Sequence, residues 1–146
     1  MENFLLQREL TISCSRTERG KHMQLGIRLH DIKKAPLEER LAIAKEQGFL
    51  CGHLALSKVI PEYSVDDGAL TPGYAMYVKK IFAKNDLDIA VLGCYLNLAN
   101  PDEGQLAKIT HRYLAHIRFA SLLGVGVVGT ETGAVNEAYK FEEKNH

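Results

Sequence analysis

Short apolar segments and longer amphipathic segments alternate along most of this chain of 146 residues. The apolar segments predict β-strands at residues 24–29, 49–56, 88–95 and 125–129. Segments with the apolar spacing of α-helices lie between them, at residues 36–47, 72–85 and 102–123. Each strand-plus-helix unit has about 25 to 40 residues, which is enough for the right-handed crossover between parallel strands. The sequence therefore predicts a parallel α/β fold in the order β-α-β-α-β-α-β.

Residues 124–133 contain the string G-x-G-x-x-G, which in dinucleotide-binding folds follows a strand and opens a helix. Here the order is reversed, because a predicted helix precedes the string and a β-branched run follows it. Gly124 is therefore interpreted as the C-terminal cap of the helix. The valines of residues 125–128 are interpreted as a short buried strand that includes Gly126 and Gly129. A nucleotide-binding doubly wound domain is supported only by this string, and equal spacing of the units favours part of a (β/α)-barrel.

The composition gives no support to several classes of partner. Lys plus Arg and Asp plus Glu both number 18, so a basic surface for nucleic acid has no support. No apolar run approaches the roughly 18 residues of a membrane span, and residues 1–10 are too acidic for a signal peptide. Cys14, Cys51 and Cys94 match no zinc or redox spacing. We expect a cytoplasmic protein with no nucleic-acid or membrane partner, in which Cys51 and Cys94 are buried strand residues.

The chain is expected to divide into three parts. Residues 1–22 are polar toward their end and lack a strand or helix period, so they predict a flexible leader. Residues 23–133 hold the four strands, and the compact domain is expected to begin near Met23. Residues 134–146 are rich in charged residues and predict a polar C-terminal tail.

Three segments resemble strands of the xylose isomerase-like barrels, a superfamily of sugar-phosphate isomerases, epimerases and apurinic endonucleases. Residues 48–56 (GFLCGHLAL) resemble the GFDGVEL pattern of strand two. Residues 92–101 (LGCYLNLANP) resemble the end of strand three and its loop, and residues 123–133 (LGVGVVGTETG) resemble strand four. The resemblance spans roughly residues 23–133 and implies a parallel (β/α)4 half of a TIM-type barrel.

The resemblance implies chemistry on a sugar or sugar phosphate, supported by a divalent metal such as Mn, Zn, Mg or Co. The family takes its metal ligands from strands five to eight, so this chain alone is expected to bind no metal and to be inactive. The nuclease branch also uses histidines at the ends of early strands. At the corresponding position of strand three this sequence has Leu92 and Gly93, so the nuclease branch is disfavoured. A homodimer, or pairing with a second half-barrel, is expected to complete the fold. The alternatives are a non-enzymatic assembly or binding module and a truncated reading frame of such a barrel.

The candidate site residues lie where the predicted strands end. Glu131 follows strand four and is the candidate catalytic residue, with a structural bond to nearby backbone amides as the alternative. His53 takes a position where the family often has an inward Glu or Gln, so it is a candidate substrate-binding residue, or else a core histidine. Tyr95 and Asn97 lie beyond strand three on one parity and are further candidates for substrate binding, or else exposed loop residues.

Strand one contributes a possible anion-binding pair. Arg28 and His30 share one face and are candidates to bind a phosphate or carboxylate, with a plain structural role at the rim as the alternative. Lys58, in a predicted loop after strand two, could also bind an anion, with a solvated loop side chain as the alternative. His111 and His116 are five positions apart on a predicted helix, so they do not share a face and are expected on the surface without a role.

Overall fold

A computed structural model describes residues 23–60, 67–131 and 133, and in it four parallel strands form one sheet in the order β1-β2-β3-β4. The strands are β1 (Gly26–Arg28), β2 (Cys51–Ala55), β3 (Asp88–Gly93) and β4 (Val128–Gly129). A doubly wound sheet reverses its strand order at a switch point, whereas a barrel keeps neighbouring strands in sequence order. The fold is therefore α/β with a parallel sheet, as predicted, and is consistent with part of a TIM-type barrel.

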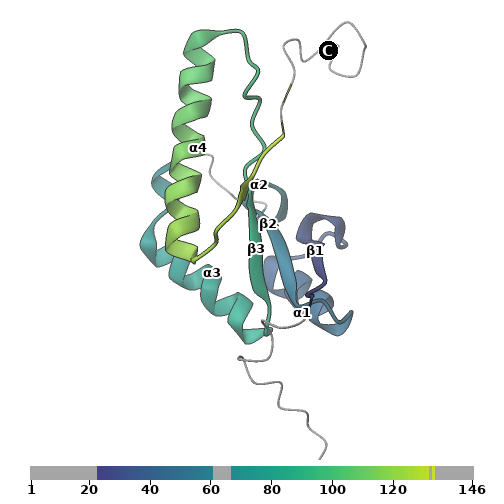
Figure 1. Ribbon diagram of the computed structural model, residues 1–146. Helices are drawn as coiled ribbons and strands as arrows, with labels where there is room; N and C mark the ends of the chain where they lie inside the picture. The colour runs from purple at the N-terminus through teal and green to yellow at the C-terminus, as the bar shows by residue number, and fades with distance from the viewer. Residues whose placement is uncertain (1–22, 61–66, 132, 134–146) are drawn as a thin grey trace, which may run out of the picture.

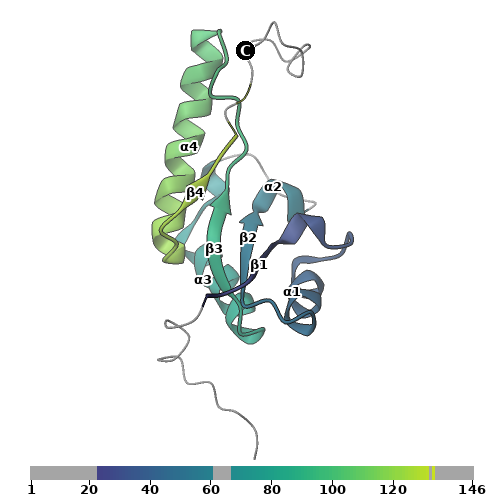
Figure 2. The ribbon, with the colours of Figure 1, turned by 45° about the vertical axis from the view of Figure 1, so that its right-hand side comes forward.

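Three helices longer than two turns accompany the sheet: α1 (Leu37–Glu46), α3 (Pro72–Lys84) and α4 (Glu103–Leu123). In Figures 1 and 2, α4 stands beside β4 and β3, and α3 lies below it on the same side of the sheet. Helices α3 and α4 pack against each other, and α1 packs against α3. The helices therefore form a layer on one face of the sheet, and the other face is left to the candidate site.

The predicted helix ends are confirmed. The side chain of Thr71 accepts a hydrogen bond from the Tyr74 amide at 3.2 Å, which caps α3. Asp102 caps α4 in the same way, accepting from the Gln105 amide at 2.7 Å. Gly124 follows α4 with a φ of 75°, a left-handed conformation that glycine adopts without strain.

Three short helical turns lie where the sequence predicts strand ends or a loop. The strand predicted to reach Leu56 ends at Ala55, and the helix α2 (Leu56–Val59) follows it directly. Leu56 and Val59 are three positions apart, so one helical turn buries both, which an extended chain would not do. The 3-10 helices η2 (Leu29–Asp31) and η3 (Asp67–Ala69) form the other two turns.

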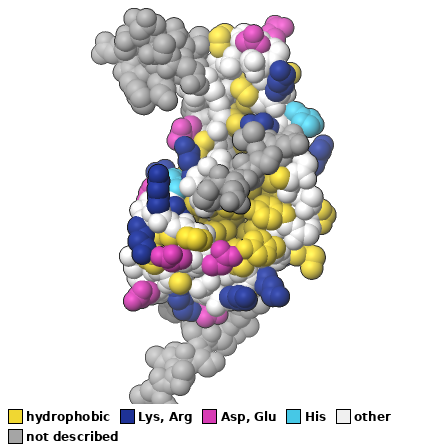
Figure 3. Space-filling model, turned by 180° about the vertical axis from the view of Figure 1, so that it is seen from behind, with side chains coloured by type: hydrophobic (Ala, Val, Ile, Leu, Met, Phe, Trp, Pro, Cys, Tyr) yellow, Lys and Arg dark blue, Asp and Glu magenta, His cyan; other side chains and the backbone are white. Residues whose placement is uncertain are grey.

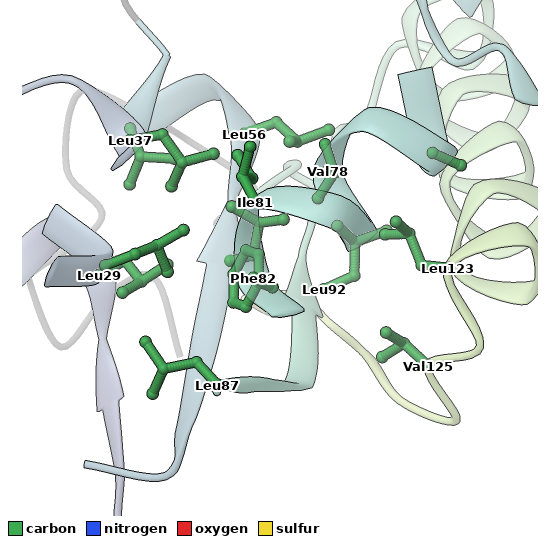
Figure 4. Close-up of a cluster of buried hydrophobic side chains, with 14 of the residues drawn as sticks. Leu29, Leu37, Leu56, Val78, Ile81, Phe82, Leu87, Leu92, Leu123 and Val125 are labelled. Atoms are coloured by element: carbon green, nitrogen blue, oxygen red, sulfur yellow. The ribbon is translucent and has the colours of Figure 1, made fainter. Parts of the chain in front are cut away.

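The hydrophobic core fills the space between the sheet and the helices (Figure 4). Leu54 and Leu92, from the two central strands, are fully buried in it. A Cβ at Gly52 would contact Leu29 of the same core, so Gly52 and Leu54 face the helices. Since successive strand residues face opposite ways, His53 points to the other face of the sheet.

Strand four is shorter than predicted. Val125 is buried at the end of α4, but Val127 is 52% exposed, and the strand comprises only Val128 and Gly129. The prediction of a buried strand through all three valines, with Gly126 inside it, is therefore wrong. Residues 125–127 connect the helix layer to the sheet, and only Val128 and Gly129 after them pair with β3.

The buried stripe of α4 also differs from the prediction. His116, expected on the surface, is buried at 4% exposure, and its Nδ1 lies 2.9 Å from the Arg112 carbonyl oxygen. Ile117, the apolar residue next to it, is 44% exposed. The two positions differ by about 100° around a helix, so the apolar spacing alone does not decide which of them faces the core. His111 is exposed, as predicted.

The predicted leader and tail, residues 1–22 and 134–146, lie outside the described residues. In the part of the chain that the structure describes, no helix combines the length and apolarity needed to cross a membrane.

Candidate functional site

Three aromatic rings meet at the carboxyl ends of three neighbouring strands. His30 follows β1, His53 lies on β2 and Tyr95 follows β3; Figure 2 shows these strands side by side. The ring centroids are 5.7 Å apart for His30 and His53, and 5.8 Å apart for each histidine and Tyr95. We call these three residues the ring cluster. In parallel α/β barrels this end of the sheet is where active sites lie.

His53 is the centre of the ring cluster. It is half-buried, and its Nε2 lies 3.3 Å from the Tyr95 hydroxyl. On the neighbouring strand, Gly93 leaves the space that the imidazole occupies, because a Cβ at position 93 would overlap Nε2 of His53. The glycine of β3 is therefore part of what positions this histidine.

His30 is in direct contact with Arg28. The Nε and Nη2 atoms of Arg28 lie 3.1 and 2.7 Å from Nε2 of His30. A guanidinium can only donate, so Nε2 of His30 accepts, and the proton of the neutral ring lies on Nδ1. That Nδ1 is buried and has no hydrogen-bond partner among the described residues.

The surroundings of both histidines favour the neutral imidazole. Burial is the largest cause that lowers the pKa of His30, followed by the positive charge of Arg28; the Asp31 carboxylate opposes the shift. Burial likewise lowers the pKa of His53, with further lowering from His30 and Arg28. Both rings are therefore neutral near pH 7 and can accept a proton or a hydrogen bond.

A buried arginine that the sequence analysis missed holds the turn around His30. Arg40, on α1, donates to the carbonyl oxygens of Leu29 at 2.8 Å, Ile32 at 3.0 Å and Ala35 at 2.8 Å. Arg40 is only 5% exposed. The signal was present in the sequence, since Arg40 occupies the buried stripe of α1, where a cation needs a fixed set of acceptors.

Asn97 and Glu131 lie outside the ring cluster. Oδ1 of Asn97 accepts from the Ala99 amide at 3.1 Å, so this side chain folds back onto its own loop. A Cβ at Gly133 would overlap Asn97, which shows how closely the two segments pack. Glu131 is exposed beyond β4, on the far side of β3 from His53. The structure thus brings together four of the six candidates, namely the ring cluster and Arg28. The roles of all six stay predictions.

The residues described do not make a metal site. Within residues 23–60, 67–131 and 133, no group of three His, Cys, Asp or Glu side chains could hold a metal ion. The ring cluster offers two imidazoles, and the Nε2 of His30 already accepts from Arg28. The divalent metal that the resemblance implies therefore does not fit the described part of this chain.

A cavity of about 710 Å³ opens at the opposite end of the sheet. It is lined by the start of β3 at Asp88 and Ile89, by Lys79 and Lys80 of α3, and by the end of α4. Because the ring cluster is at the carboxyl ends of the strands, this cavity does not belong to it.

Comparison with known proteins supports the fold. No family model and no curated protein match the sequence. Among solved structures, the fold is similar to the crystal structure of D-psicose 3-epimerase in the presence of D-fructose, a TIM barrel, with a TM-score of 0.54 and 20% sequence identity. The match covers 74% of this chain and 37% of that one. At this identity the likeness shows the fold alone, and this chain spans little more than a third of the length of that structure.

Proposed function

We propose that this chain is the N-terminal (β/α)4 portion of an isomerase or epimerase that acts on a sugar or sugar phosphate. The observation that carries the proposal is the ring cluster, in which His30, His53 and Tyr95 meet at the carboxyl ends of three adjacent parallel strands. The likeness to a D-psicose 3-epimerase supports it at the level of the fold.

The chemistry of the cluster suits a polyhydroxylated substrate. Isomerisation and epimerisation move a proton on a carbon next to a carbonyl or hydroxyl group, so they need a positioned acid or base. A neutral His53 can accept a hydrogen bond or a proton at Nε2, and the Tyr95 hydroxyl beside it can donate or accept. In this proposal these two residues bind sugar hydroxyls. Asn97 and Glu131 act from outside the ring cluster, Asn97 as a substrate-binding residue of the loop after β3 and Glu131, beyond β4, as the carboxylate that serves proton transfer. A metal would be held by residues of the remaining barrel, so this chain alone is inactive.

We also propose that a second copy of the chain pairs with the exposed edges of the sheet. In the described part, β1 and β4 each pair with one strand only, so both have an unpaired edge. Exposed apolar side chains lie next to both edges: Leu25 is 68% exposed just before β1, and Val127 is 52% exposed just before β4. Burying such residues against a partner removes apolar surface from water, which favours pairing.

Sedimentation velocity at micromolar concentration tests the pairing. The dimer is expected for the unmodified chain, and Val127→Lys is expected to shift it toward the monomer. Met76→Lys is the matched control, since Met76 is 73% exposed on α3, away from the sheet edges. A monomer for the unmodified chain, or equal effects of the two substitutions, would reject the homodimer and leave a different half-barrel as the partner.

Sugar binding tests the proposed function. In an NMR titration with D-fructose or D-psicose, the imidazole resonances of His53 are expected to shift, and His53→Ala is expected to abolish binding. His111→Ala, at an exposed position on α4, is the control and should bind as the unmodified chain does. If neither sugar perturbs His53 while the dimer forms, the alternative of a non-enzymatic assembly module is favoured.

A further inference from the structure

We propose that Arg28, His30 and Lys58 form a binding site for an oxyanion, such as a phosphate or carboxylate group, and that binding is coupled to the uptake of one proton by His30. The site lies at the rim of the ring cluster, on β1, on the turn after it and on α2.

The charges around His30 are mainly positive. Arg28, Lys58 and Arg40 all act on the imidazole as cations, and Asp31 is the one carboxylate among the described charges that opposes them. Asp31 lies 3.6 Å from Nε of Arg28 and 4.0 Å from Nε2 of His30. Both Arg28 and Asp31 have more than half of their side-chain surface exposed, so water screens their attraction and an anion can compete for the guanidinium.

The two ring nitrogens of His30 are poorly matched by their hydrogen-bond partners among the described residues. Its Nε2 accepts from a cation, and its buried Nδ1–H has no acceptor. An unmatched buried donor costs free energy, so the fold holds the neutral ring without full hydrogen bonding, and the Arg28 contact is the only hydrogen bond of its side chain among the described residues. The remaining groups that face the ring, His53 and Tyr95, contact it through ring edges.

An oxyanion gives Nε2 of His30 a different partner. A phosphate or carboxylate that forms two hydrogen bonds with the Arg28 guanidinium draws it away from Nε2 of His30. The freed Nε2 then takes a proton from solvent, becomes a donor, and can bind the same anion. Lys58, exposed on α2, adds a third positive charge. Between the pKa of His30 in the free chain and its higher pKa in the complex, up to one proton is taken up for each anion bound, and no covalent bond is made or broken.

The inference extends the proposed function, and it rests on that function only in assigning the anion to a sugar. A sugar phosphate or sugar acid would place its charged group at Arg28 and its hydroxyl groups at His53 and Tyr95. Such a substrate is preferred over a neutral sugar because its charged end binds Arg28 and Lys58, whereas a neutral sugar brings no negative charge to these two cations.

The test uses the full chain and inorganic sulfate, because the charge of sulfate is constant between pH 5 and pH 8. The pKa of His30, followed by NMR, is expected to rise when sulfate replaces chloride at equal ionic strength. Sulfate affinity is expected to fall severalfold as the pH rises through that pKa. Unchanged His30 titration, or an affinity independent of pH, would overturn the coupling. Inorganic phosphate and acetate at pH 7 then show whether the site favours phosphate or carboxylate.

Substitutions at exposed positions complete the test. Arg28→Gln and Lys58→Gln are each expected to weaken sulfate binding roughly tenfold, the effect of about 1.4 kcal/mol. Lys33→Gln is the matched control, because Lys33 is an exposed cation that pairs with Glu39 at 3.0 Å. Equal weakening by all three would indicate nonspecific attraction and reject the site. If the chain binds D-fructose and does not bind sulfate, the proposed function stands and the anion site is rejected. If the chain binds sulfate and does not bind D-fructose, the anion site stands and the proposed function is rejected.

Discussion

Gly93 on β3 lies directly against the imidazole of His53 on β2. A Cβ at position 93 would overlap Nε2 of His53 and would come within 3.0 Å of the Ala55 Cβ. Atoms this close must move, and Ala55 is fully buried, so the imidazole is the part that gives way.

Gly93→Ala is therefore expected to displace His53 and to break its contact with Tyr95, while the chain stays folded. NMR should show altered His53 and Tyr95 resonances and a loss of sugar binding. Gly126→Ala is the control, since a Cβ there would meet nothing within 4 Å. An unchanged His53 environment in Gly93→Ala would show that the sheet adjusts instead.

The buried Arg40 guanidinium ties α1 to the turn that carries His30. Arg40→Leu removes the donor for three carbonyl oxygens, of which those of Leu29 and Ile32 are bonded in buried surroundings. Each buried acceptor left without a donor costs about 1–3 kcal/mol, so unfolding by urea should show a loss of at least that size.

A positioning role for Arg40 predicts more than lower stability. The turn that bears His30 should become mobile, so anion binding should weaken even at temperatures where the variant is fully folded. Arg118→Leu, at an exposed position of α4, should change neither property. If stability falls and anion binding is unchanged, Arg40 stabilises the core and does not position His30.

The fold was largely predictable from local signals in the sequence. Gly124 marks a helix end through its backbone chemistry, as predicted, and Thr71 caps the helix that was predicted to begin at residue 72. The strand predicted at residues 88–95 forms at Asp88–Gly93 and lies between β2 and β4, and its apolar composition is typical of a strand inside a parallel sheet. Each of these signals arises from residues that are close together in the sequence, so no knowledge of the tertiary structure is needed to detect it.

What sequence reasoning missed depends on contacts between distant segments. Whether His116 or Ile117 faces the core is set by where α4 crosses the sheet, and spacing cannot give that angle. The role of Arg40 depends on three carbonyl oxygens that approach it only when the turn after β1 is formed. The meeting of His30, His53 and Tyr95 could be expected from strand order, whereas the contact of Arg28 with Nε2 of His30 could not.

The two capping side chains give a direct test of the helix ends. Thr71→Ala and Asp102→Ala each remove the acceptor for one amide at a helix N-terminus, and each should lower the free energy of unfolding by about 1 kcal/mol. Their effects should add, because they cap different helices. Thr110→Ala, at an exposed position inside α4, serves as the control and should be close to neutral. A neutral Thr71→Ala would show that water replaces the cap.

The two described cysteines should react slowly in the folded protein. Cys51 and Cys94 are 9% and 4% exposed, and burial, followed by the charge of Asp88, raises the pKa of the Cys51 thiol. Because the thiolate is the reactive form, alkylation by iodoacetamide at pH 8 should be roughly tenfold or more slower than in urea. Peptide mass spectrometry reports each cysteine separately. Rapid labelling of Cys51 in the absence of denaturant would mean that the sheet opens readily around β2.

The two histidines of the ring cluster should make stability depend on pH. Their pKa values are lowered in the folded state, so below about 6.5 the unfolded chain binds protons that the folded chain does not. Stability should therefore be full above pH 6.5 and should decrease as the pH falls from there toward the lowered pKa values. Urea unfolding at pH 5, 6, 7 and 8 measures this slope. His30→Gln and His53→Gln should each flatten it, whereas His111→Gln, at an exposed site, should leave it unchanged. If the slope is the same in all three variants, the loss of stability arises from other groups, and the two rings are not held neutral by the fold.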